Sequence, residues 1–147
     1  MRIYLPSSRT DREQFARGSS HLELDAGRAA FAATDSVRAE QPGTDDEDLE
    51  YEALQEAAFV ALSETEPHSR ALVIAAEVPA RAITGHPEQL GAFGLTLGAG
   101  QARIVAFHVT EQTATAAAAD DTDPDLLWFD AAEPAAALDY LGGGALE

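Results

Sequence analysis

The chain contains four histidines, whose side chains titrate closest to neutral pH and most often act as general acids or bases. They lie far apart, without the HxH or HExxH spacing of a metal site, at His21, His68, His86 and His108. His108 is the strongest catalytic candidate, because it lies in a strand predicted at 103–110. There it would share a face with Ile104 and Ala106 and could work with a nearby carboxylate. The simpler interpretation is a core or edge histidine whose ring nitrogens are satisfied.

An acidic segment near the C-terminus has the opening pattern of a calcium-binding loop. Asp121, Asp123 and Asp125 show its D-x-D-x-D spacing. An EF-hand also needs glycine at position six and a bidentate glutamate at position twelve, where this chain has Leu126 and Ala132. The calcium-loop pattern therefore fails, and a solvated acidic loop is the simpler interpretation. The three aspartates stay candidates only for a cation site of another geometry.

Whole classes of chemistry are excluded by residue types that the chain lacks, because it contains neither cysteine nor lysine. Disulfides, thiol nucleophiles and cysteine-bound zinc are impossible, as are Schiff-base chemistry, pyridoxal phosphate anchoring and a Walker-A lysine. Gly98-Ala99-Gly100 lacks the third glycine of a dinucleotide fingerprint, since Arg103 stands there, and predicts a hairpin turn. The G-x-S-x-G elbow of a serine hydrolase is also missing. We predict no bound cofactor and no metal.

Carboxylates dominate the charge: 26 acidic residues stand against nine arginines, for a formal net charge of −17 at pH 7. Such a charge disfavours nucleic acid and anionic membranes as partners. Solubility through self-repulsion is the simplest explanation, and the alternatives are a basic protein partner, a DNA-like surface or adaptation to a salty cytoplasm. If a partner binds, the candidate contacts are the carboxylates Glu50, Glu52 and Glu56, on a predicted helix.

The clearest predicted element is a helix over 45–63. Thr44 and Glu47 have the spacing of a capping box at its start. Its apolar positions recur at helical spacing on one stripe, at Leu54, Ala58, Ala61 and Leu62. Residues 71–76 are apolar at both odd and even positions, which is typical of a strand covered on both faces. Other strands are predicted at 2–5, 29–34, 93–97, 103–110 and 126–129, and other helices at 11–17 and 133–141.

Strands alternate with helices along the chain, a pattern typical of α/β folds. The sequence therefore predicts one α/β domain over residues 1–147, with a loose tail at 142–147. Its sheet is expected to be five- to six-stranded, mostly parallel or mixed, and flanked by helices. Trp128 and Phe129 are predicted to pack in the core, although an aromatic pair beside an acidic loop could also contact a partner.

The expected location is the cytoplasm. No segment approaches the run of about 18 apolar residues that a membrane span needs. Pro6 interrupts the first apolar residues before they reach the run of about 7–15 that is typical of a signal peptide. We expect no membrane partner.

Three short segments carry a resemblance to a known family. The chain opens with MRIYLP, continues with DLEYEAL in the predicted acidic helix, and has DLLWF towards its C-terminus. These segments resemble an uncharacterised family of small actinobacterial proteins, whose members open with an MR-hydrophobic-Tyr-hydrophobic-Pro strand and carry a late Leu-Leu-Trp-aromatic strand. The resemblance covers nearly the whole chain. It implies a bacterial intracellular protein of one domain. The family has no assigned activity, so the resemblance assigns no catalytic role to any residue.

Three functions remain as hypotheses. The leading one is a small non-catalytic regulatory or interaction module that binds a basic protein through an acidic, helix-presented surface. The alternative is a small-molecule enzyme, for example a hydrolase, that uses His108 with a nearby carboxylate. The third is a nucleic-acid mimic whose carboxylates are spaced like phosphates. The first leads because each catalytic pattern fails at a required position.

Overall fold

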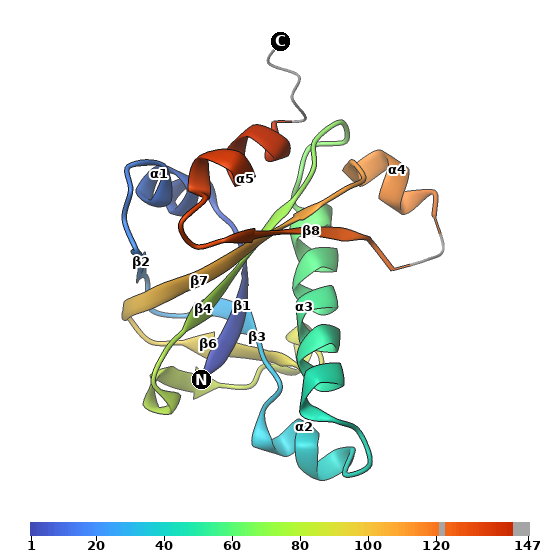
Figure 1. Ribbon diagram of the computed structural model, residues 1–147. Helices are drawn as coiled ribbons and strands as arrows, with labels where there is room; N and C mark the ends of the chain where they lie inside the picture. Colours follow the sequence, from blue (N-terminus) through green and yellow to red (C-terminus); the bar gives the residue numbers. More distant parts are fainter. Residues whose placement is uncertain (121–122, 143–147) are drawn as a thin grey trace.

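Helices cover both faces of an eight-stranded sheet in the computed structural model, which describes residues 1–120 and 123–142 (Figure 1). The strands are β1 (Arg2–Pro6), β2 (His21–Leu24), β3 (Arg28–Phe31), β4 (Leu72–Glu77), β5 (Ile83–Gly85), β6 (Gly94–Leu97), β7 (Gly100–Thr110) and β8 (Leu126–Asp130). The helices are α1 (Arg9–Ala16), α2 (Asp35–Glu40), α3 (Asp46–Ser63), α4 (Ala114–Ala118) and α5 (Pro134–Leu141), with 3₁₀ turns η1 (Ala80–Ala82) and η2 (Glu88–Leu90). The order across the sheet is β2-β7-β4-β1-β3-β6-β5, and β8 also pairs with β7.

Every strand pair among the described residues is antiparallel, so the prediction of a five- to six-stranded, mostly parallel or mixed sheet is wrong. A helix does connect two strands of the same direction, as expected for a parallel sheet: α3 lies between β3 and β4 in the chain, and these two strands run in the same direction. However, β1 lies between them and pairs antiparallel with both. The apolar pattern of β4 indicates only that both its faces are covered. It is equally compatible with antiparallel neighbours, so it could not predict strand direction.

The sheet is bent, because two long segments that pair with each other change direction at the same place. Residues 21–31 and 94–103 pair as one antiparallel ribbon, first as β2 with β7 and then as β3 with β6. The bend lies after β2, where Gly27 has a φ of 87° and its N–H donates to the Leu97 carbonyl at 2.8 Å. Glycine adopts this positive φ without steric cost. Because of the bend, β6 and β7 follow each other without pairing with one another, and the hairpin predicted at Gly98-Ala99-Gly100 is wrong.

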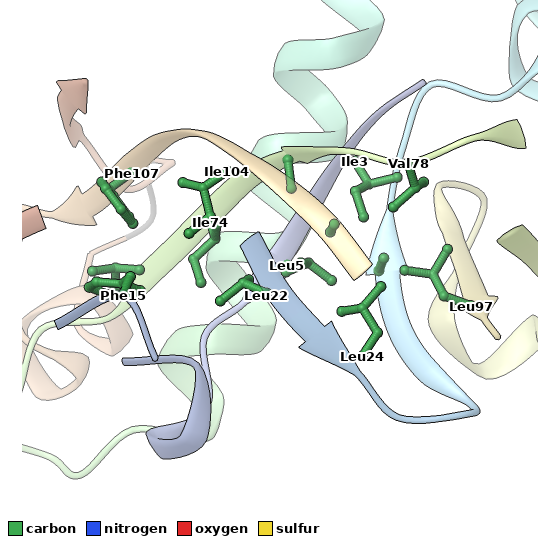
Figure 2. Close-up of a cluster of buried hydrophobic side chains, with 14 of the residues drawn as sticks. Ile3, Leu5, Phe15, Leu22, Leu24, Ile74, Val78, Leu97, Ile104 and Phe107 are labelled. Carbon is green, nitrogen blue, oxygen red and sulfur yellow. The ribbon is translucent and has the colours of Figure 1, made fainter. Parts of the chain in front are cut away.

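One apolar core lies between this bent ribbon, the central strands, α1 and α5. Phe15 of α1 packs on Phe107 of β7, with ring centroids 4.6 Å apart. Figure 2 shows side chains from five strands and α1 meeting in this core: Ile3, Leu5, Phe15, Leu22, Leu24, Ile74, Leu97, Ile104 and Phe107. Burying each large side chain contributes about 1.5–3 kcal/mol. This core therefore joins α1 and α5 to one face of the sheet.

A second core lies under α3 on the opposite face. The apolar stripe predicted for this helix is buried against the sheet, at Leu54, Ala58, Ala61 and Leu62. The helix begins at Asp46, one residue after the predicted start, and no side-chain bond caps it. The capping box predicted from Thr44 and Glu47 is therefore wrong. The acidic first turn still lies favourably at the positive end of the helix dipole.

The first helix starts earlier than predicted. Its capping box is formed by Ser8 and Asp11, two residues before Thr10 and Glu13, which have the same spacing in the sequence. The Asp11 N–H donates to Ser8 Oγ at 3.1 Å, and the Ser8 N–H donates to the Asp11 carboxylate at 2.9 Å. Both pairs have the spacing of a capping box, so the spacing alone does not identify the pair that caps the helix.

A β-bulge in β7 changes which of its side chains share a face. The register against β4 shifts by one residue at Val105. As a result, Ile104 lies in the same core as Phe107, whereas Ala106 lies in the core under α3. The prediction that Ile104 shares a face with His108 is therefore wrong. Side chains alternate along a strand, so one extra residue reverses the faces beyond it.

Candidate functional site

His108 lies in the second half of β7, on the face that α3 covers. Its ring meets that of Tyr4, two strands away on β1, edge-on with centroids 6.4 Å apart. Burial lowers the pKa of His108 to about 4, and the nearby positive charge of Arg2 adds to the shift. The imidazole is therefore neutral at pH 7.

Acid–base chemistry at His108 would need a carboxylate partner. Its ring makes no hydrogen bond to any residue that the structure describes, and no carboxylate contributes to the shift of its pKa. It lines neither the small cavity beside Phe59 nor the groove beside α1. This geometry is that of a histidine packed at the margin of a core.

The three helix carboxylates do not form one group. Glu50 is half-buried near Tyr4, and its negative charge, after burial, is the second cause that raises the pKa of the Tyr4 hydroxyl. Glu52 and Glu56 are exposed on α3. Of these three carboxylates, Glu52 and Glu56 are therefore the two that are fully open to a partner.

The acidic loop before β8 is attached to α3 through its proline. Pro124 is buried, while Asp123 and Asp125 on either side of it are exposed. Asp121 lies outside the described residues. Over 1–120 and 123–142, no three acidic or histidine side chains lie close enough together to hold a metal ion. The Pro124 carbonyl accepts a hydrogen bond from Gln55 Nε2 at 3.3 Å.

Gln55 of α3 is a candidate that the sequence analysis missed. Its side chain is only 6 % exposed, and its Nε2 also donates to Tyr51 Oη at 2.9 Å. Its Oε1 is buried and has no hydrogen-bond partner in the part of the chain that the structure describes. A buried acceptor without a partner costs about 1–3 kcal/mol. The sequence did contain a signal for this residue, because Gln55 is an amide within the apolar face of the predicted helix.

Trp128 and Phe129 of β8 point to opposite faces of the sheet. Phe129 packs against Tyr140 of α5, with ring centroids 6.0 Å apart. Trp128 pairs with His108, lies on the α3 side and is 59 % exposed. The prediction that both aromatic rings pack in the core is therefore wrong for Trp128, and its exposure leaves the partner-contact interpretation open.

β8 also presents an unpaired edge. Its one neighbour in the described sheet is β7. At the end of the strand, the Asp130 N–H donates to Glu133 Oε1 at 3.1 Å instead of to β7. Backbone groups alternate in direction along an antiparallel strand, so the N–H and C=O of Trp128 face the same open edge.

These residues define one surface, which we call the α3–β8 surface: Tyr51 and Phe59 of α3, Pro124, and Trp128 of β8. Among the described residues, four large apolar side chains are exposed, and three of them belong to this surface. The fourth, Leu127, points to the other face of β8. A cavity of about 170 Å³ lies where Phe59 and Pro124 meet α4.

The fold and this surface define the class: an antiparallel α+β domain with an exposed aromatic face bordered by acids. The chain belongs to DUF6912, a family of unknown function, whose family model matches residues 1–138. The expectation of an uncharacterised family is thus confirmed, while the actinobacterial origin stays a prediction. No curated protein and no solved structure matches the chain. None of the helices in the described ranges combines the length and apolar character needed to cross a bilayer.

Proposed function

We propose that this protein is a non-catalytic interaction module that binds a basic, extended segment of another protein at the α3–β8 surface. The observation that carries the proposal is Trp128, which is 59 % exposed on a strand with an open edge. Exposed tryptophans are enriched among the residues that dominate binding energy in protein interfaces. We propose that this binding takes place in the cytoplasm, the location expected from the sequence.

The open edge of β8 supports an extended partner. A segment that adds as a further strand exchanges main-chain hydrogen bonds with Trp128, and its alternate side chains contact the α3–β8 surface. Glu133 already occupies the Asp130 end of the edge. The free part of the edge therefore lies at Leu126 to Trp128.

The charge around the surface supports a basic partner. Glu52 on α3, and Asp123 and Asp125 beside Pro124, are exposed, and the chain as a whole carries −17. Opposite charges at the rim of an interface speed association and suppress binding of acidic competitors.

Selection of random short peptides displayed on phage tests the proposal. We expect the enriched peptides to alternate lysine or arginine with apolar residues and to bind more weakly as salt rises. Because Trp128 is the chain's one tryptophan, its fluorescence reports binding at the proposed surface directly. Burial of the indole should shift the emission to shorter wavelength.

Two variants of β8 make the test specific. Trp128→Ala should weaken peptide binding at least about tenfold, measured by calorimetry because the variant lacks the fluorophore. Leu127→Ala is the matched control, since this exposed neighbour points to the other face and its loss should leave the affinity unchanged. Acidic enriched peptides, failure to enrich any peptide, or equal binding by Trp128→Ala would each refute the proposal.

The other two hypotheses, a small-molecule enzyme and a nucleic-acid mimic, stay predictions. The enzyme alternative gains no support from the surroundings of His108, which include no hydrogen-bonded carboxylate among the described residues. Nucleic-acid mimicry predicts that duplex DNA competes for the same basic partner. Strand addition to β8 predicts instead that a single extended peptide is sufficient for binding.

A further inference from the structure

A groove of about 1100 Å³ lies at the end of the sheet, between α1, α5 and the C-terminal end of α3. Neither Tyr51 nor Trp128 lines it, so it is separate from the α3–β8 surface. Four of the chain's nine arginines do line it: Arg9, Arg12, Arg28 and Arg70. A chain with a net charge of −17 thus gathers almost half of its cations in one concavity.

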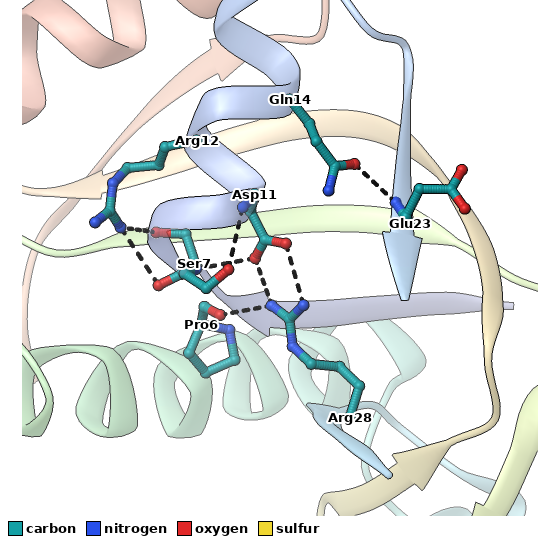
Figure 3. Close-up of polar contacts among 8 residues, drawn as sticks. Pro6, Ser7, Asp11, Arg12, Gln14, Glu23 and Arg28 are labelled. Carbon is teal, nitrogen blue, oxygen red and sulfur yellow. Dashed lines mark hydrogen bonds and ion pairs between the residues drawn. The ribbon is translucent and has the colours of Figure 1, made fainter. Parts of the chain in front are cut away.

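Two of these arginines lie on α1 and have donors to spare. Arg9 makes no hydrogen bond or ion pair with any residue that the structure describes. Arg12 uses one nitrogen, Nη1, which donates to Ser7 Oγ at 3.0 Å (Figure 3). The other N–H groups of both guanidinium groups are free to bind a ligand.

Arg70 reaches the groove from the loop before β4. Its Nε donates to the Glu111 carbonyl at 3.1 Å, and its Nη1 donates to the Tyr140 carbonyl at 3.0 Å. The guanidinium also lies 4.2 Å from the centre of the Tyr140 ring. These neutral partners hold the side chain in place without neutralising its charge. Arg9, Arg12 and Arg70 therefore have no carboxylate partner within the described ranges.

Arg28 has a different role in the wall of the groove. Its guanidinium binds both oxygens of Asp11, at 2.5 and 3.1 Å, and donates to the Pro6 carbonyl at 2.9 Å (Figure 3). Asp11 is only 1 % exposed and also caps α1. This buried pair cancels the charge of Arg28 and positions the start of the helix that carries Arg9 and Arg12.

We propose that the groove binds a small molecule through one oxyanion group, a carboxylate or a phosphate, held by Arg9 and Arg12 with Arg70 as a third cation. Guanidinium groups match both oxyanions through charge-assisted, bidentate hydrogen bonds. Glu13, Glu64 and Glu66 also line the groove. They repel a polyanion, so the rest of the ligand is neutral or cationic. This inference goes beyond the proposed peptide binding and does not depend on it.

Arginine Nε–Hε resonances in NMR spectra give one signal for each of the nine side chains and test the proposal directly. Sodium phosphate and sodium acetate are titrated separately at constant ionic strength. We expect saturable shifts at Arg9, Arg12 and Arg70, and none at Arg81, which is exposed outside the groove. A larger affinity for one salt identifies the oxyanion as phosphate or carboxylate.

Charge-removing variants complete the test. Arg9→Gln and Arg12→Gln should each weaken binding of the better anion about tenfold, in line with the loss of a charge-assisted hydrogen bond. Arg81→Gln is the control and should bind unchanged. Shifts that stay linear with concentration, equal shifts at Arg81, or full binding by Arg9→Gln would overturn the inference. None of these results bears on peptide binding at Trp128.

Discussion

At the scale of single residues, burial decides how His108 behaves. An exposed histidine has a pKa near 6.5, whereas burial and Arg2 lower the pKa of His108 to about 4. The unfolded chain therefore takes up a proton on this histidine at a pH where the folded protein does not. Protonation of His108 favours unfolding throughout that window.

The pH dependence of stability checks this argument. As pH falls from about 6.5 to about 4, His108 should cost up to about 3 kcal/mol of the free energy of unfolding. His108→Gln should remove that part of the loss, measured by urea unfolding at several pH values. His68→Gln, at an exposed position, is the control and should follow the wild-type curve. If His108→Gln also follows that curve, the histidine is not buried as described.

At the scale of elements, a buried ion pair attaches α1 to the sheet. Asp11 lies in the first turn of α1, and Arg28 opens β3. Asp11 caps its own helix and binds the guanidinium at the same time (Figure 3). Loss of its carboxylate leaves the Ser8 N–H without its acceptor and a mostly buried cation without its counter-charge.

We therefore expect Asp11→Ala to lower the free energy of unfolding by about 3 kcal/mol, measured by urea denaturation. Asp46→Ala removes the exposed partner of Arg38 and should cost no more than about 1 kcal/mol. Similar costs for the two variants would contradict the assignment of Asp11 as a structural tether.

At the scale of the whole molecule, excess negative charge opposes the compact state. The chain carries −17, and among the described residues few carboxylates are paired with arginine. Like charges that are forced together on folding repel one another, and dissolved salt screens this repulsion.

Stability should therefore rise as sodium chloride increases from low to physiological concentration, seen as a higher midpoint of urea unfolding. Neutralising two exposed carboxylates with Glu52→Gln and Glu56→Gln changes the net charge from −17 to −15 and should reduce this salt dependence. If salt lowers the midpoint instead, attractive ion pairs outweigh the repulsion.

Local pattern alone was enough for several parts of this protein. The period of the apolar residues located α3 and the stripe it buries, and the apolar run at 71–76 located β4. Missing cysteine and lysine excluded whole chemistries, and three short segments pointed to an uncharacterised family. These features depend on residues close together in the chain, so a linear sequence displays them.

Strand direction, by contrast, was decided by the tertiary structure, because β1 inserts between two strands that the chain connects through α3. One bulged residue, Val105, turned Ile104 away from His108. Pairing with β7 placed Trp128 on an open edge, and folding brought Arg70 to the groove lined by α1. Each outcome depends on contacts between residues far apart in the chain. Neither the local spacing of apolar residues nor the composition shows how favourable such contacts are.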